Sequence, residues 1–284
     1  AIKTGLRNMN IFPSLRLKSL PPLMLGAALA SAPVPAQETP VETLFFDGLE
    51  AFEPAVMRIS RLELLDPHIF ADVFLCADVT ETFNSETNAG LNGDADGDGF
   101  LDASPLLLME PFAPPRSGRL AQGEGACTAP AETTACGVVT AGAPAPFEPR
   151  ETAVCRGPLA GTTSGYMPPV PTIGGPCFTD RPGDRQQALG GVTLTLLDAV
   201  VAGAYAPTSP DQIGSGLLRG FVREVDAENA LIPADVPVIG GLPLAAVLPG
   251  GVGNCAAGDD RDTLDGEPGW WFYLSFDAER APTP

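Results

Sequence analysis

The chain has 284 residues, 44% of them hydrophobic, so it can bury a substantial core and is not a disordered chain. Its formal net charge at pH 7 is -19, which makes nucleic acids and anionic membranes poor partners. Glycine (32 residues) and proline (31 residues) are frequent, which indicates many turns and long loops.

The N-terminal part has the pattern of a signal peptide. Met9 is a plausible start, so residues 1–8 are possible upstream sequence. Arg16 and Lys18 precede a short apolar stretch at 20–30, and small residues end at Ala36. We therefore predict a signal peptide within 1–36 and a secreted, periplasmic or cell-surface protein. No apolar run is long enough for a transmembrane segment.

The next segments predict a β domain at 56–284. Residues 37–55 are acidic and proline-bounded, which is typical of a tether or an edge strand. Apolar residues then alternate with charged ones from Met57 to Leu64, and a second apolar run covers 69–79. Asp66 and Pro67 lie between the two runs, so we expect two strands joined by a turn.

A glycine-rich acidic loop follows, with carboxylates at alternate positions. Oxygen ligands at every second residue of a tight loop suit a hard divalent cation, and a glycine takes the strained turn. The predicted ligands are the side chains of Asp94, Asp96, Asp98 and Asp102 and the carbonyl of Phe100. The competing interpretation is an acidic surface turn without an ion.

The loop resembles known calcium-binding loops over about a dozen residues. Counting Asp94 as the first position, the ligands follow the order of an EF-hand loop, with Gly99 at the sixth position. The twelfth position, Pro105, departs from the bidentate Glu of an EF-hand and precedes a strand-like run at 106–110. The loop is therefore more similar to those of thrombospondin type 3 and dockerin repeats. This resemblance implies calcium in a structural role, bound with a Kd on the order of 10⁻⁴ to 10⁻³ M.

Residues 111–190 are rich in Pro and Gly and contain four of the six cysteines. We expect a long loop insertion with little regular structure, ordered by disulfides. An even number of cysteines in an exported chain predicts three disulfides, for which fifteen pairings exist. We favour the pairs Cys127 with Cys136, Cys155 with Cys177, and Cys76 with Cys255.

The C-terminal third has a strong β pattern. Strands are expected at 192–197, 217–225 and 270–276, with single helical turns at 226–231 and 242–248. Strands separated by turn-rich loops predict an all-β fold, an antiparallel β-sandwich or jelly roll in one domain.

Two further candidate sites lie in this part. The acidic residues Asp260, Asp262 and Asp265 either hold a second cation or form a solvated loop. On the last strand, one face carries Trp270 and is expected in the core. The other carries Trp271 and Tyr273, which either form a platform for a sugar ring or are buried.

The sequence has no recognisable catalytic motif. His68 is the single histidine, and no Gly-x-Ser-x-Gly element is present. We predict an exported calcium-binding structural or binding protein whose other partners are carbohydrate or another surface protein. The alternative is a secreted carbohydrate-active enzyme or a carbohydrate-binding module.

Overall fold

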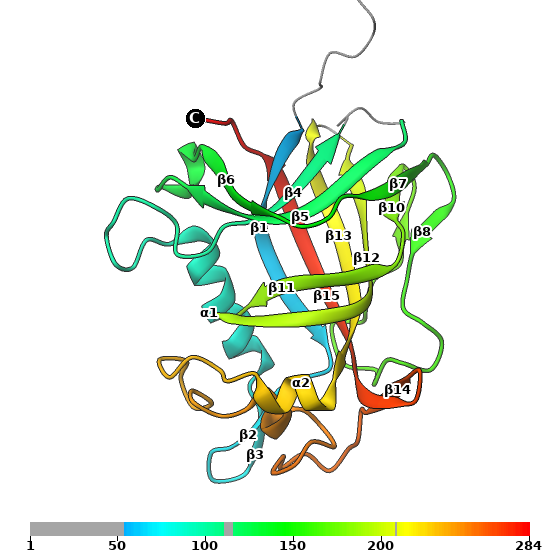
Figure 1. Cartoon of the computed structure of the whole chain (residues 1–284). Helices are drawn as coiled ribbons and strands as arrows, with labels where there is room; N and C mark the ends of the chain where they lie inside the picture. The colour runs from blue at the N-terminus through cyan, green and yellow to red at the C-terminus, as the bar shows by residue number, and fades with distance from the viewer. Residues whose placement is uncertain (1–53, 111–115, 208) are drawn as a thin grey trace, which may run out of the picture. The chain divides into compact units, whose positions relative to one another are not determined.

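Long antiparallel strands dominate the fold, as Figure 1 shows. The computed structural model describes residues 54–110, 116–207 and 209–284, which belong to one compact unit. The predicted all-β antiparallel class is confirmed. The predicted signal peptide at 1–36 lies outside the described residues, as does the proposed tether except for residues 54 and 55. Ala55 begins the first strand.

Eight strands form a sheet that closes on itself. The last strand pairs with the first as well as with its predecessor in the sheet, so the ring has no open edge along these pairings. In sheet order the eight strands are β1 (Ala55–Asp66), β4 (Pro105–Glu110), β5 (Gly118–Cys127), β7 (Ala145–Arg150), β10 (Cys177–Asp180), β12 (Val192–Ala206), β13 (Ser209–Arg223) and β15 (Glu267–Arg280).

Shorter elements extend or cover this sheet. Three outer strands pair with it: β6 (Cys136–Ala141) with β5, β11 (Gly183–Leu189) with β12, and β14 (Asp262–Leu264) with β15. Separate hairpins join β2 (Phe70–Asp72) to β3 (Cys76–Asp78) and β8 (Val154–Arg156) to β9 (Ile173–Gly174). The helices are α1 (Thr80–Asn92), α2 (Glu224–Asn229) and the 3-10 turns η1 (Ala131–Thr133) and η2 (Leu244–Val247). In the described ranges, no helix has the length and apolarity needed to cross a membrane.

The main core lies between the strands, and β15 shows how the sequence builds it. Trp270, Phe272 and Leu274 alternate toward the core and are fully buried, because successive side chains of a strand point to opposite faces. The core assignment of this face is confirmed. Trp271 and Tyr273 point the other way, into a second apolar cluster that contains parts of the β8–β9 segment.

The prediction that residues 111–190 form a loop insertion with little regular structure is wrong, because this segment supplies β5, β7 and β10 to the closed sheet. The short strand β7 shows why the pattern concealed them. Its sequence, Ala-Pro-Phe-Glu-Pro-Arg, has one buried large apolar residue, Phe147. The ring of Phe147 packs edge-on against that of Phe178 of β10, with the ring centroids 5.6 Å apart. Backbone pairing with β5 and β10 defines this strand, and one apolar side chain produces no detectable alternation.

Two further differences concern residues 69–92. The expected strand at 69–79 is a short hairpin, β2–β3, whose tip exposes Val73, Phe74 and Leu75. The following helix α1 was not predicted. Its buried stripe combines Phe83 and Leu91 with two threonines, which weakens the apolar signal. The helical turns expected at 226–231 and 242–248 correspond to α2 and η2.

All three favoured cysteine pairings are confirmed. Cys127–Cys136 and Cys155–Cys177 close short segments, while Cys76–Cys255 joins the β2–β3 hairpin to the segment that precedes β14. Three disulfides in one domain indicate an oxidising compartment.

Candidate metal centre

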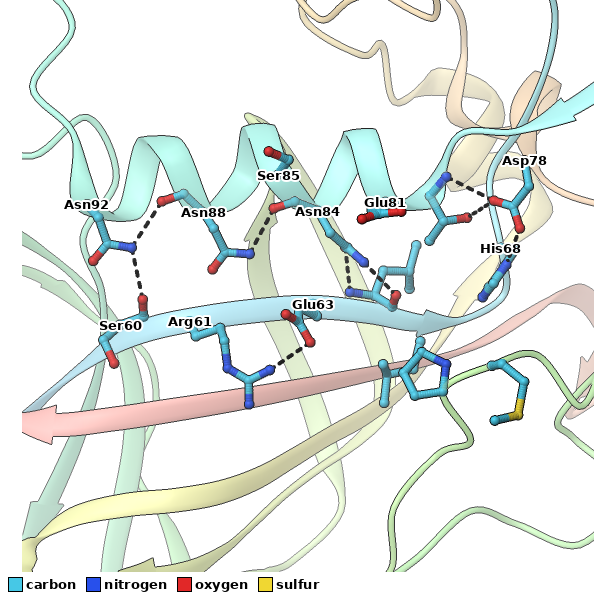
Figure 2. A pocket seen from close by; sticks show the side chains of 15 residues that line it. Ser60, Arg61, Glu63, His68, Asp78, Glu81, Asn84, Ser85, Asn88 and Asn92 are labelled. Carbon is cyan, nitrogen blue, oxygen red and sulfur yellow. Dashed lines mark hydrogen bonds and ion pairs between the residues drawn. The ribbon is translucent and has the colours of Figure 1, made fainter.

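Two asparagines of α1 attach this helix to β1, and Figure 2 shows Asn84 and Asn88 on the side of the helix that faces the strand. The Leu62 N–H donates to Asn88 Oδ1 (3.0 Å), and Asn88 Nδ2 donates to the Leu62 carbonyl (2.9 Å). Asn84 makes the same pair with Leu64, at 2.8 Å and 3.0 Å. Side chains four residues apart share a helix face, so their amides pair with β1 as a neighbouring strand would. This attachment fixes the helix that leads into the acidic loop.

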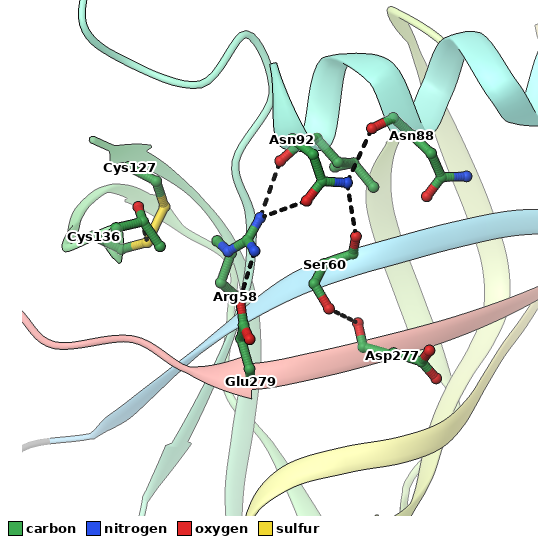
Figure 3. A network of polar contacts seen from close by, with 10 residues as sticks. Arg58, Ser60, Asn88, Asn92, Cys127, Cys136, Asp277 and Glu279 are labelled. Atoms are coloured by element: carbon green, nitrogen blue, oxygen red, sulfur yellow. Dashed lines mark hydrogen bonds and ion pairs between the residues drawn. A yellow bond between two sulfur atoms is a disulfide. The ribbon is translucent and has the colours of Figure 1, made fainter. Parts of the chain in front are cut away.

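The C-terminal end of α1 is held by a third asparagine and a buried arginine (Figure 3). Asn92 Nδ2 donates to the Ser60 carbonyl (3.0 Å), and Arg58 Nη1 donates to the Leu91 carbonyl (3.0 Å). Arg58 also forms an ion pair with Glu279 and is 3% exposed. A cation at a helix C-terminus satisfies the last carbonyls and opposes the negative end of the helix dipole. The start of the loop therefore has a fixed position.

The structure brings together three of the five predicted metal ligands. Carboxylate oxygens of Asp94, Asp96 and Asp102 all lie within 4.8 Å of one another. Asp98 is not in this group, and its Oδ1 accepts the Phe100 N–H at 2.8 Å. The three aspartates are exposed or half-buried, so an ion can reach them from solvent.

Backbone N–H groups orient the carboxylates of the loop. Asp94 accepts from Gly97 at Oδ1 (2.8 Å) and from Gly99 at Oδ2 (2.9 Å). Asp102 accepts from the N–H of Ala95 at 3.1 Å. Gly97 and Gly99 have φ values of 74° and 91°, a region that favours glycine, and this backbone turn directs successive N–H groups at Asp94. The sixth loop position is thus occupied by glycine because the turn requires it.

The second half of the loop pairs with the end of β5. The Leu101 N–H donates to the Cys127 carbonyl (2.9 Å), and the Gly99 carbonyl accepts from the Ala129 N–H (2.9 Å). These two hydrogen bonds flank Phe100 and use the backbone on either side of it. The loop is therefore anchored to the sheet at both of its ends.

A cleft of about 930 Å³ opens beside the three aspartates. The chain leaves the loop through Ser104 into β4, which begins at Pro105, so a strand stands where an EF-hand has a helix. Ser104 and Glu124 line the cleft together with the three aspartates. Burial raises the pKa of Glu124. Ser104 is 3% exposed, and its Oγ has no hydrogen-bond partner among the described residues.

The predicted second metal site is not assembled. Asp260 accepts a hydrogen bond from the Tyr166 hydroxyl (2.6 Å), and Asp262 accepts one from the Thr263 N–H (2.7 Å). Asp265 lies in the turn between β14 and β15 with a φ of 54°. Among the described residues, the acidic groups close enough to share an ion do not include these three. The carboxylates of this segment accept hydrogen bonds from a nearby backbone N–H and from a tyrosine hydroxyl.

Of the two alternatives for Trp271 and Tyr273, burial is confirmed and the sugar platform is not formed, because the outer face of β15 is covered. Trp271 is 6% exposed and Tyr273 is 0% exposed. The Tyr273 hydroxyl accepts the Leu159 N–H at 3.0 Å, and the Arg219 guanidinium lies 5.4 Å from the Trp271 ring centre. A sugar ring has no access to these faces. Alternation separates the two faces of a strand but does not reveal that a distant segment covers the outer one.

Sequence reasoning missed a polar cluster around His68, at one end of a cleft of about 890 Å³ between α1 and β1 (Figure 2). His68 Nδ1 lies 2.5 Å from Asp78 Oδ2, and Thr80 donates to Asp78 Oδ1 through its hydroxyl (2.6 Å) and its N–H (3.0 Å). The imidazole stacks on Tyr166 with centroids 3.8 Å apart. Burial opposes ionisation of Asp78, but the hydrogen bonds from Thr80 and His68 outweigh it and lower its pKa. His68, Asp78 and Thr80 flank the β2–β3 hairpin, but Tyr166 comes from a distant segment, so no sequence spacing indicates the whole cluster.

Asp66 lies beside this cluster, and its burial leads us to predict that the stability of the protein depends on pH. Asp66 is 2% exposed, and burial raises its pKa to about 6, although Ser164 donates a backbone N–H to it. The unfolded carboxyl has a pKa near 3.9, so the folded state holds the proton more tightly. The contribution of Asp66 to the free energy of unfolding therefore falls as pH rises from about 4 to about 6.

We expect Asp66→Asn to remove this loss, because an amide oxygen still accepts the Ser164 N–H and carries no charge. Above pH 6.5 the variant should exceed the wild type in free energy of unfolding by about 1 kcal/mol, and near pH 4 the gain should vanish. Urea denaturation at pH 4, 5 and 7 measures this, with the exposed Asp211→Asn as control. A gain that is the same at all three pH values would contradict it.

Of the candidate metal and ligand sites predicted from the sequence, the loop at 94–102 is the one whose side chains the described structure brings together. No protein-family model matches the chain, and no curated protein and no solved structure is significantly similar to it.

Proposed function

We propose that this protein binds calcium in the loop at 94–102 and that the ion stabilises an exported antiparallel β domain with a structural or binding role. The observation that carries the proposal is the convergence of carboxylate oxygens from Asp94, Asp96 and Asp102 within 4.8 Å. In this proposal Asp98 and the Phe100 carbonyl complete the ligand set, as the ligand order of the sequence implies.

Electrostatics favours an ion in the loop. Unit charges about 5 Å apart repel by about 1 kcal/mol per pair even in water. A divalent cation among the three aspartates replaces this repulsion by attraction. Oxygen-only ligands in an irregular arrangement suit calcium, whereas zinc favours nitrogen and sulfur, and magnesium requires a near-ideal octahedron.

The expected affinity fits an extracellular or periplasmic role. Without a bidentate Glu at the twelfth position we expect a Kd on the order of 10⁻⁴ to 10⁻³ M, which is typical of extracellular calcium modules. The three disulfides agree with export. Trp271 is buried and offers no surface to a further partner.

Thermal melts of the oxidised protein in calcium, magnesium or EDTA test the proposal. At 10 mM calcium the stabilisation should be about 1.4–2.7 kcal/mol, or a rise in Tm of several degrees. The variant Asp96→Asn with Asp102→Asn keeps the acceptor oxygens of both side chains and should lose most of this rise.

The matched control is Asp262→Asn with Asp265→Asn, which removes the same charge from the other acidic segment and should respond to calcium as the wild type does. A wild type that calcium does not stabilise, or a loop variant that responds fully, would refute the calcium proposal.

A further inference from the structure

We infer that the Cys127–Cys136 disulfide sets the calcium affinity of the loop at 94–102, so that reduction of this bond weakens calcium binding and calcium protects the bond from reduction. The inference rests on the proposed function, since it concerns the regulation of the same site. The calcium site is then redox-sensitive, and the ion does more than stabilise the fold.

Hydrogen bonds connect the two features directly. The loop residues Gly99 and Leu101 pair with Ala129 and Cys127, at 2.9 Å each. The turn that follows is closed by a backbone hydrogen bond from the Thr128 N–H to the carbonyl at 135 (3.0 Å) and by the disulfide itself. The segment that receives the loop is therefore the one that the disulfide closes.

Apolar packing adds a second connection. Leu101 is 6% exposed and belongs to one buried cluster with Cys127 and Cys136, which are both 0% exposed. The loop residue between the predicted ligands Phe100 and Asp102 thus lies in the same apolar cluster as the two cysteines. Figure 3 shows the disulfide together with the Arg58 contacts that hold the entry to the loop.

Reduction of the disulfide weakens the turn at 127–136, which pairs with the calcium loop. A thiolate of a dithiol attacks one cysteine sulfur and releases the other as a thiolate, and the second thiol of the reagent then closes a ring and frees the first cysteine. Two electrons pass from the dithiol to the protein, and two protein thiols result. The backbone pairing of β5 with β6 then holds residues 127 and 136 together without the disulfide, so the turn that pairs with Gly99 and Leu101 loses its covalent closure.

Thermodynamic linkage makes the effect reciprocal. If the oxidised state binds calcium more tightly by a given factor, calcium stabilises the oxidised state by the same factor. In this inference calcium also stabilises the loop whose Leu101 packs in the same cluster as the two cysteines, and reduction of a buried disulfide requires such packing to open. Both the affinity and the reduction rate therefore report the coupling.

The Cys155–Cys177 disulfide provides a matched control. It lies in a different buried cluster, together with Trp271 and Tyr273 on the outer face of β15. Its removal costs a covalent link of comparable kind without touching the loop.

The first measurement is the calcium Kd by calorimetry on the full chain. Cys127→Ser with Cys136→Ser should bind calcium about tenfold more weakly than the wild type, and Cys155→Ser with Cys177→Ser should stay within about twofold of it.

The second measurement needs no cysteine variant: dithiothreitol is added with or without calcium, and alkylation with mass spectrometry follows each disulfide. Calcium should slow the loss of Cys127–Cys136 about fivefold or more and leave Cys155–Cys177 unchanged. This protection should disappear in the variant Asp96→Asn with Asp102→Asn.

The outcomes separate this inference from the proposed function. A wild type that binds no calcium overturns both. A wild type that binds calcium, but whose Cys127–Cys136 bond is reduced at the same rate with and without the ion, overturns the coupling alone. If the serine pair fails to fold, the reduction rates in the wild type decide the question.

Discussion

Replacing both Asn84 and Asn88 with alanine is expected to lower the free energy of unfolding by about 3–5 kcal/mol. Each asparagine makes two hydrogen bonds to the backbone of β1, one with an N–H and one with a carbonyl. Alanine leaves the N–H and carbonyl of Leu62 and Leu64 without these partners, and an unsatisfied buried polar group costs about 1–3 kcal/mol. The adjoining cleft admits water, which offsets part of the loss.

Urea denaturation measures the change, and amide hydrogen exchange localises it. The N–H groups of Leu62 and Leu64 should lose their protection in the double variant. Thr82→Ala with Ser85→Ala changes two exposed positions of the same helix and should stay within about 0.5 kcal/mol of the wild type. A double asparagine variant as stable as this control would show that α1 is held by its apolar face alone.

The second large effect concerns the longest disulfide. Cys76 and Cys255 are 179 residues apart, so their bond restricts the unfolded chain more than the others do. The loop-entropy relation gives about 5 kcal/mol for this separation, against about 3 kcal/mol for the 22 residues between Cys155 and Cys177. We expect Cys76→Ser with Cys255→Ser to lose about 2–5 kcal/mol and to destabilise the protein more than the shorter pair.

Guanidinium chloride denaturation of the two serine pairs compares them under one condition. The m value should rise more in the Cys76–Cys255 variant, because its unfolded state expands further. A smaller loss in this variant than in the Cys155–Cys177 variant would mean that the β2–β3 hairpin contributes little to the folded state and that native contacts rather than chain entropy dominate.

The sequence predicted the parts of the fold that local patterns encode. Strict alternation placed Trp270, Phe272 and Leu274 in the core, and short spacing indicated the pairs Cys127–Cys136 and Cys155–Cys177. At the candidate metal centre, the alternate aspartates and Gly99 indicated a tight loop, and three of the carboxylates do converge. Asp98 shows the limit of spacing, since its carboxylate lies outside this group and accepts a local backbone N–H.

The features that were missed depend on contacts between distant segments. β7 is defined by backbone pairing, because its prolines and single phenylalanine carry no alternation. α1 is held by Asn84 and Asn88 against β1, a pairing of side chain with backbone that hydrophobic periodicity does not register. The same holds for His68, whose ring lies against Tyr166 almost a hundred positions later in the chain. Burial of Trp271 likewise depends on a covering segment that belongs to another part of the sequence.

The closed sheet imposes an order on folding. β15 lies between β13 and β1, and its register pairs Arg280 with Met57, near opposite ends of the described chain. Such pairings raise the contact order, and domains with many of them fold in milliseconds to seconds rather than microseconds. Until β15 arrives, β1 and β13 both present unpaired strand edges that can associate with other chains. Synthesis of this protein therefore includes a period in which the nearly complete domain is open and prone to aggregation, and the arrival of its last strand ends that period.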